Sequence, residues 1–175
     1  AVSPGAFLPG ARDLADFRST RLSATVADLS EVWDVFYNGS RTPAPLKSFA
    51  AYAAHRWADP LVFLLLVGDA SEDHRGIGVD SQPDFLPSHS LWTDYEGAPE
   101  ETDQYYAEVT SDGLGNFDDL SDLYVGRLSV GTLEEMQWNV QRSMNPEEEA
   151  RNANYPRIRL FRVPLKTAES PQPDV

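Results

Sequence analysis

The fold of this chain is decided by the stretch Leu61-Val62-Phe63-Leu64-Leu65-Leu66-Val67-Gly68-Asp69. An unbroken apolar run between Pro60 and Gly68 is typical of a strand that is buried on both faces. Such a strand lies inside a parallel sheet that helices cover on both sides. Ligands and catalytic groups of open α/β sheets gather at the carboxyl ends of the strands, so we expect any chemistry to lie near Gly68 and Asp69.

The segment before this strand predicts helices that alternate with strands. Ala1–Pro9 is expected to be an irregular lead-in, so no strand is predicted before Ala11. The order favours an α/β fold, a three-layer α/β/α sandwich with a mainly parallel sheet. The expected elements are a helix over Ala11–Thr20, a strand over Leu22–Ala27, a helix over Glu31–Tyr37 capped by Asp28 or Ser30 and ended by Asn38-Gly39, and a helix from Thr42 or Pro43 to Trp57.

The segment after the central strand is less regular. Ala70–Glu101 is polar and rich in Pro, Gly and Asp, which favours a long functional loop. A helix is expected from Leu133 to about Met144, with Met136 and Val140 on its apolar side, and Pro146 is expected to stop it. Short strands are expected over Gln104–Val109, Leu123–Val125 and Ile158–Val163.

Composition limits the classes of function. The 175 residues suit one domain, residues 1–175, with a full core. The chain carries 28 acidic and 14 basic residues, a formal net charge of −14, so nucleic acid and anionic lipid are not expected partners. No apolar run approaches the roughly 20 residues that span a bilayer, so no membrane insertion is expected. The sequence has no cysteine, so this chain supplies no thiol nucleophile.

Three charged residues come nearest to the predicted strand ends: Asp69, Asp103 and Arg127. Arg127 is expected to bridge to one of the two aspartates, and the three residues either hold loops in place or face a substrate cleft. His55 lies on a predicted helix, where a packing or surface role is expected. His74 and His89 lie in the predicted long loop, and no Gly-x-Ser-x-Gly elbow accompanies them.

Two stretches could hold metal ions. The bend from Asp112 to Asp122 is rich in oxygen ligands, which favours calcium, although a solvated turn explains the same composition. Its candidate ligands are Asp112, Asn116, Asp118, Asp119 and Asp122. The second stretch, Gly68-Asp69-Ala70-Ser71-Glu72-Asp73-His74, faintly resembles the Gly-Asp-x-x-Asp element of binuclear metallophosphoesterases, with Asp69 and Asp73 as ligands.

Three motifs in order resemble the gingipain family of cysteine peptidases. They are Leu64-Leu65-Leu66-Val67-Gly68-Asp69, Thr102-Asp103-Gln104-Tyr105-Tyr106 and Val125-Gly126-Arg127-Leu128-Ser129-Val130, the last followed by the Glu134-Glu135 helix. The segments Leu14-Ala15-Asp16-Phe17-Arg18 and Trp33-Asp34-Val35-Phe36 fit the family's early region, so the similarity runs from about Leu14 to Met144.

The resemblance implies a caspase-like sandwich from a secreted or surface-exposed bacterial endopeptidase that cleaves polypeptides. The family uses a cysteine thiolate and a histidine in a Gly-His-Gly context, and this sequence contains neither. We therefore assign no catalytic residue, and expect an incomplete, amino-terminal part of a peptidase domain whose partner is the remainder of that domain or another chain. The family's structural calcium adds to the case for the Asp112–Asp122 turn. The alternatives are a non-catalytic scaffold with a peptidase-derived fold and a metal-dependent phosphoesterase.

Overall fold

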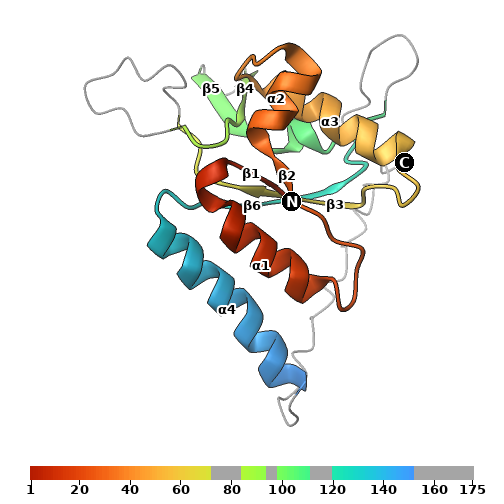
Figure 1. Cartoon of the computed structure of the whole chain (residues 1–175). Helices are drawn as coiled ribbons and strands as arrows, with labels where there is room; N and C mark the ends of the chain where they lie inside the picture. Colours follow the sequence, from red (N-terminus) through yellow and green to blue (C-terminus); the bar gives the residue numbers. More distant parts are fainter. Residues whose placement is uncertain (72–83, 94–97, 111–119, 152–175) are drawn as a thin grey trace, which may run out of the picture.

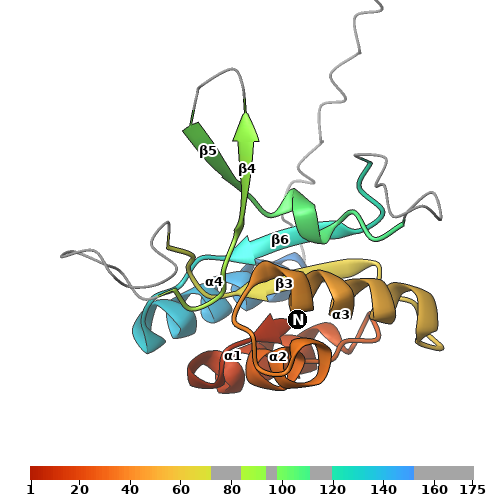
Figure 2. The ribbon, with the colours of Figure 1, turned by 90° about the horizontal axis from the view of Figure 1, so that it is seen from above.

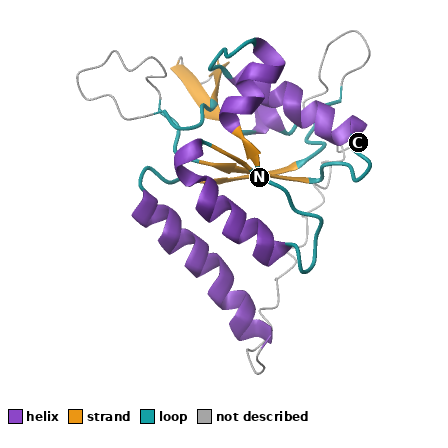
Figure 3. Ribbon diagram, viewed as in Figure 1, coloured by secondary structure: helices purple, strands orange, loops and turns teal. Residues whose placement is uncertain are grey.

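The computed structural model describes residues 1–71, 84–93, 98–110 and 120–151. These residues form three layers, with a sheet between two pairs of helices (Figures 1 and 3). Helices α1 (Leu8–Arg18) and α4 (Leu133–Arg151) cover one face of the sheet. Helices α2 (Leu29–Tyr37) and α3 (Pro43–Arg56) cover the other face. The predicted α/β/α sandwich is confirmed.

The main sheet has four parallel strands in the order β2-β1-β3-β6. Its longest members are β3 (Phe63–Val67) and β6 (Tyr124–Leu128), which pair along their whole length. β3 lies between β1 and β6, and Leu64, Leu66 and Val67 are almost completely buried. The apolar run therefore forms an interior strand, as predicted.

The centre of the sheet also contains a strand that the sequence pattern did not predict. β1 (Val2–Ser3) pairs in parallel with both β2 (Ala27–Asp28) and β3, and both of its residues are fully buried. The prediction that no strand precedes Ala11 is wrong, and so is the longer strand expected over Leu22–Ala27. Two residues are too few to show an alternating pattern, so tertiary packing alone reveals these strands.

The helix ends follow local chemistry. The Asp28 carboxylate accepts a hydrogen bond of 2.9 Å from the Ser30 N–H and caps α2, whose other end is Asn38 in the left-handed conformation (φ 51°). At α4, the Glu135 N–H donates to the Thr132 hydroxyl, and the Glu135 carboxylate accepts from the Thr132 N–H. This reciprocal pair is a capping box, and it fixes the start of α4.

Helix α4 packs on α1 through the predicted apolar stripe. Met136 and Val140 are buried in one cluster with Phe7 and Leu14, and Gly10 lies directly under the Met136 side chain. The helix continues to Arg151, so the prediction that Pro146 stops it is wrong. A proline removes one N–H donor and disfavours helix in the preceding residue, but it does not forbid the helix.

The predicted long loop contains a hairpin. Strands β4 (His89–Thr93) and β5 (Ala98–Thr102) pair antiparallel and project beyond the main sheet (Figure 2). A single turn of 3₁₀ helix, η2 (Gln104–Tyr106), follows in place of the strand expected over Gln104–Val109; another, η1 (Gly5–Phe7), precedes α1. Tyr106 explains the difference: its buried ring anchors the turn, and its hydroxyl donates to the Pro87 carbonyl at 2.5 Å.

The strand expected at Ile158–Val163 lies outside the described residues. None of the helices in the described part of the chain combines the length and the apolar character that crossing a bilayer requires.

Candidate functional site

Arg127 is the centre of the site at the carboxyl ends of β3 and β6. Its side chain is only 11% exposed. One terminal nitrogen, Nη1, donates to the carbonyl oxygens of Gly68 at 2.8 Å and Leu86 at 2.7 Å. The other, Nη2, reaches the Pro87 carbonyl at 3.4 Å. The guanidinium thus joins the end of β3 to the segment that leads into the hairpin.

The same guanidinium holds Asp103 in a two-pronged ion pair. Nε lies 2.8 Å from Oδ2 of Asp103, and Nη2 lies 2.6 Å from Oδ1. This fork-to-fork geometry matches the planar guanidinium to the carboxylate and is the strongest form of the interaction. Because Asp103 precedes η2, the pair fixes the position of η2 relative to the sheet. Of the two aspartates considered for Arg127, the structure pairs it with Asp103.

Asp69 lies at the rim of this site and does not contact Arg127 through its carboxylate. Its side chain is exposed and accepts from its neighbour, the Ala70 N–H, at 3.2 Å. Its backbone is held on two sides, since its N–H donates to the Val130 carbonyl and its carbonyl accepts from the Phe85 and Leu86 N–H groups. The backbone of Asp69 therefore ties the strand end to the loop, and its carboxylate faces solvent.

Gly68 allows the chain to turn at this point. Its φ of +124° lies in the region that residues with a Cβ rarely adopt, and an added Cβ would lie 3.0 Å from the Cβ of Phe85. A glycine at the end of β3 therefore brings the segment around Phe85 against the sheet, where Arg127 reaches its carbonyl groups.

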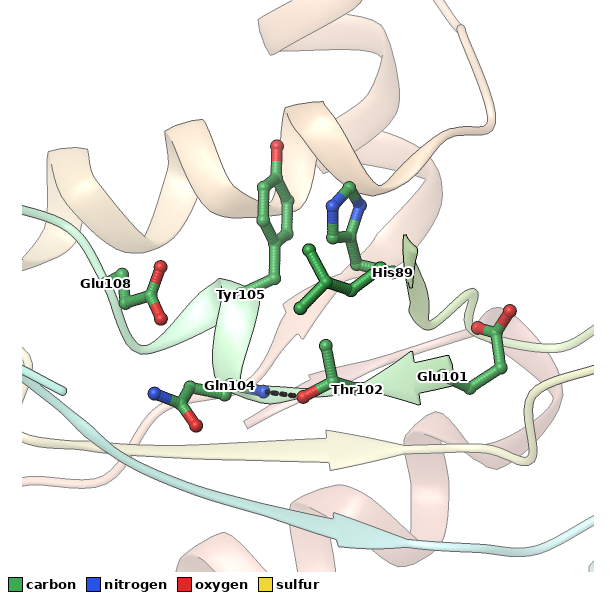
Figure 4. Close-up of a pocket in the computed structure, with 7 residues that line it drawn as sticks. His89, Glu101, Thr102, Gln104, Tyr105 and Glu108 are labelled. Carbon is green, nitrogen blue, oxygen red and sulfur yellow. Dashed lines mark hydrogen bonds between the residues drawn. The ribbon is translucent and has the colours of Figure 1, made fainter. Parts of the chain in front are cut away.

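An open pocket of about 630 Å³ lies next to this ion pair, between β4, β5 and η2 (Figure 4). Thr102 and Gln104, which flank Asp103 in the sequence, line it. The His89 ring stacks on the Tyr105 ring with 3.9 Å between centroids. The remaining lining residues are Leu91, Glu101 and Glu108. The Arg127–Asp103 pair thus supports one wall of the pocket.

Lys47 of α3 stabilises the aromatic wall from within the protein. Its side chain is 9% exposed, and Nζ lies 4.1 Å from the centre of the Tyr105 ring and 4.0 Å from Oε2 of Glu108. Burial lowers the pKa of Lys47, and the Glu108 carboxylate partly offsets this. Burial also lowers the pKa of His89, and the nearby Lys47 charge lowers it further. Both effects favour the neutral form of the His89 ring, and the Glu101 and Glu108 carboxylates partly oppose them.

Of the predicted calcium ligands, the structure describes one. Asp122 Oδ2 accepts from the N–H groups of Val109 at 2.9 Å and Thr110 at 2.8 Å. These backbone hydrogen bonds, chiefly the one from Thr110, lower the pKa of Asp122. The other four candidates, Asp112, Asn116, Asp118 and Asp119, lie outside the described residues.

The two histidines that the structure describes have different surroundings. His55 on α3 lies 3.3 Å from the Val109 carbonyl, and His89 belongs to the pocket. Asp73, which the phosphoesterase hypothesis needs beside Asp69, lies outside the described residues, and so does His74. The sequence analysis did not identify Lys47 or Tyr105 as site residues, because a buried lysine on a helix and a tyrosine in a turn carry no spacing signal.

Comparison with solved structures shows what this architecture is similar to. Latent dimeric PorU of Porphyromonas gingivalis superposes with a TM-score of 0.71 and 23% sequence identity over 86% of this chain. The complex of the pro- and mature domains of RgpB from the same organism superposes with a TM-score of 0.60 and 18% sequence identity over 82% of this chain. This chain spans 15% of the PorU chain and 27% of the RgpB chain. At these identities the likeness shows the fold.

Comparison of the sequence with protein families identifies the family of this chain. No curated protein matches it significantly. The family model described as peptidase family C25 matches residues 1–161, which include every element of the sheet and both helical layers. The match contains the Gly68–Asp69 turn, Asp103 and Arg127. The chain is therefore a member of peptidase family C25.

Proposed function

We propose that this chain is the amino-terminal part of a cysteine endopeptidase domain, and that it forms one side of a cleft for polypeptide substrates. The thiolate and imidazole that cleave the peptide bond come from residues outside this chain. Membership of the C25 family supports the peptidase class, and the absence of cysteine from the sequence supports the assignment of the thiolate to residues outside this chain.

The observation that carries the proposal is the Arg127 cluster. A guanidinium that is 11% exposed binds one carboxylate in two places and two backbone carbonyls at 2.7 and 2.8 Å, all at the carboxyl ends of β3 and β6. Cleft residues of open α/β sheets gather at this end of the strands. Because its hydrogen-bonding groups are engaged within the protein, Arg127 positions the cleft wall and does not bind substrate itself.

The exposed carboxylate of Asp69 and the pocket lined by His89 and Tyr105 are the groups of this wall that remain accessible. Both lie beside segments that Arg127 holds, so a bound polypeptide would contact a surface that is already ordered. Pre-ordering of this kind reduces the entropic cost of binding. We place the protein at the bacterial cell surface or outside the cell, as the likeness to the gingipain family implies.

The acidic turn adds a structural calcium ion to the proposal. Asp122 fixes one end of the turn through the Val109 and Thr110 N–H groups, and the oxygen-rich residues before it supply further ligands. Calcium should raise the melting temperature of the chain relative to excess chelator, and magnesium at the same concentration should not. Identical melting curves in calcium and chelator would remove calcium from the proposal.

The enzymatic proposal is tested by comparing this chain with a gene product that continues past Val175. The 175-residue chain alone should not cleave peptides that contain arginine or lysine. A product that continues past Val175 into a Gly-His-Gly motif and a cysteine should cleave them, and alkylation of that cysteine should abolish the activity. Thiol-sensitive cleavage by the short chain, or a gene that ends near Val175, would refute this division of roles.

A further inference from the structure

The hairpin of β4 and β5 forms a sheet of its own, with two outer edges. Within the described part of the chain, each of its strands pairs only with the other. The hairpin projects beyond the main sheet (Figure 2). The outer edge of a strand carries backbone N–H and C=O groups that can pair with a strand of another polypeptide. What the hairpin binds therefore depends on the backbone groups that each edge presents.

The register of the hairpin shows which backbone groups point outward. Trp92 lies opposite Pro99, and Ser90 lies opposite Glu101. Because proline has no N–H, Trp92 and Pro99 cannot exchange a pair of backbone hydrogen bonds, so their backbone groups point away from the partner strand. Hydrogen-bonded and non-hydrogen-bonded pairs alternate along an antiparallel ladder. The Ser90–Glu101 pair is two positions away, so its N–H and C=O groups point outward as well.

The outer edges of the two strands differ in what they can pair with. On β5 the outward positions are Pro99, which has no N–H, and Glu101. A proline on an edge strand hinders the addition of a further strand. On β4 the outward positions are Ser90 and Trp92, and each carries both an N–H and a C=O. Because proteins usually protect such edges, the intact edge of β4 indicates a binding surface.

The side chains on one face of this edge favour a basic partner. The hydroxyls of Ser88 and Ser90 both donate hydrogen bonds to the Glu101 carboxylate. These bonds hold the carboxylate of β5 over β4, toward the outer edge of β4. Ser90 and Glu101 are exposed. The Cβ of a residue opposite Ser90 on an added strand would lie about 5 Å from the Ser90 Cβ, so a lysine or arginine there reaches the carboxylate.

The other face of the edge offers an apolar contact. By strand alternation, His89 and Leu91 lie on the face opposite Ser90. Leu91 is 53% exposed, and it lines the pocket together with His89 and Tyr105. The residue of an added strand that follows its basic residue would point to this face. An apolar side chain at that position would cover Leu91.

We infer that an extended polypeptide segment, in which basic and apolar residues alternate, adds as a third strand to the outer edge of β4. Backbone hydrogen bonds to Ser90 and Trp92 supply binding, while Glu101 and Leu91 select the alternate side chains. The formal net charge of −14 attracts a basic segment. The inference rests on the proposed function in taking a polypeptide as the ligand, but it requires no cleavage.

Amide hydrogen exchange on the 175-residue chain tests which edge binds. The probe is an eight-residue peptide with blocked ends, in which lysine alternates with leucine. Saturating peptide should slow exchange of the Ser90 and Trp92 amides about tenfold or more and leave the outward amide of Glu101 unchanged. Slower exchange at Glu101 instead, or at none of these amides, would overturn the inference. Protection of Ser90 without peptide that is lost on dilution would assign the edge to a second copy of the chain and would also overturn it.

Two substitutions at Ser90 separate its backbone from its side chain. Ser90→Pro removes an outward N–H but none of the hydrogen bonds between β4 and β5, so it should weaken binding of the fluorescently labelled peptide about tenfold or more. Ser90→Ala is the matched control, because it loses the same hydroxyl but keeps the N–H, and it should bind within about threefold of wild type. Protected amides of Leu91 and Glu100, which face each other inside the hairpin, report that the hairpin of the proline variant is formed. Equal affinities of the two variants would overturn the inference.

Modified peptides give a second test that leaves the protein unchanged. N-methylation of every lysine in one peptide, and of every leucine in another, removes the N–H groups from opposite sides of the extended peptide. One of the two peptides should therefore lose binding about tenfold or more, while the other keeps it. Equal binding of both would overturn the inference. Glu101→Gln should weaken binding of the unmodified peptide about two- to fivefold, since one exposed ion pair is lost.

These binding assays distinguish the inference from the proposed function, because they need no thiolate. A chain that binds none of the peptides would overturn the inference and leave the peptidase role as it is. Thiol-sensitive cleavage by the 175-residue chain would refute the proposed function and leave the binding at β4 as it is.

Discussion

Replacing Arg127 with methionine tests whether one guanidinium organises the strand ends. Methionine keeps most of the length of the buried side chain but removes its charge and its hydrogen-bond donors. The carbonyls of Gly68 and Leu86 and the carboxylate of Asp103 therefore lose their partner. Breaking a buried ion pair from one side costs about 3–5 kcal/mol. Asp103 is 28% exposed, so water compensates part of this loss. We expect the free energy of unfolding to fall by about 3 kcal/mol.

Urea denaturation and thermal melting measure the loss directly. For a chain of this size, 3 kcal/mol corresponds to a fall in melting temperature of about 6–12 °C. Asp103→Asn should cost less, about 1–2 kcal/mol, because the arginine keeps its carbonyl partners. Arg12→Met on the exposed side of α1 is the control and should change stability by less than about 0.5 kcal/mol. A loss below about 1 kcal/mol for Arg127→Met would refute the organising role.

Three further predictions concern the sheet, its helical cover and the acidic turn. Gly68→Ala should destabilise the chain by about 1–3 kcal/mol in urea unfolding, because the φ of Gly68 is +124° and an added Cβ would press on Phe85. Gly126→Ala is the control and should be nearly neutral. Equal effects of the two substitutions would contradict the strain argument. Met136→Ala should lower the free energy of unfolding by about 2–5 kcal/mol in the same assay, since a buried side chain above Gly10 is truncated. A loss of stability under about 1 kcal/mol would mean that α1 and α4 move together to fill the space. The lowered pKa of Asp122 means that its carboxylate stabilises the fold above its ordinary pKa of about 4, and that this stabilisation is lost as pH falls through the folded value. The difference in free energy of unfolding between wild type and Asp122→Asn should therefore be larger at pH 6 than at pH 2.5. A difference that does not change with pH would contradict this prediction.

Local patterns of residue type and spacing in the sequence predicted the fold well. The apolar run over β3 specified an interior parallel strand, and the stripe of Met136 and Val140 specified the buried side of α4. Asn38 marked the end of α2 because it tolerates the left-handed conformation. These signals are read directly from residue type and spacing.

The features that the sequence did not predict depend on contacts between distant segments. β1 consists of two residues, and only its burial between β2 and β3 makes it a strand. The turn at Tyr106 reads as a strand from its aromatic and β-branched neighbours, but burial of the ring and the hydrogen bond from its hydroxyl to the Pro87 carbonyl favour a 3₁₀ turn. Proximity to strand ends identified Asp103 and Arg127 as candidates, while the positions of Lys47 and Tyr105 required the tertiary structure.

The central place of β1 has a consequence for synthesis of the protein. Val2 is translated before its two neighbours in the sheet, Ala27 and Leu66, which are 25 and 64 positions later. This apolar residue therefore stays without its sheet partners until Leu66 has been made. Non-local pairing of this kind slows folding, so a chaperone that binds the nascent residues around Val2 should raise the yield of native protein.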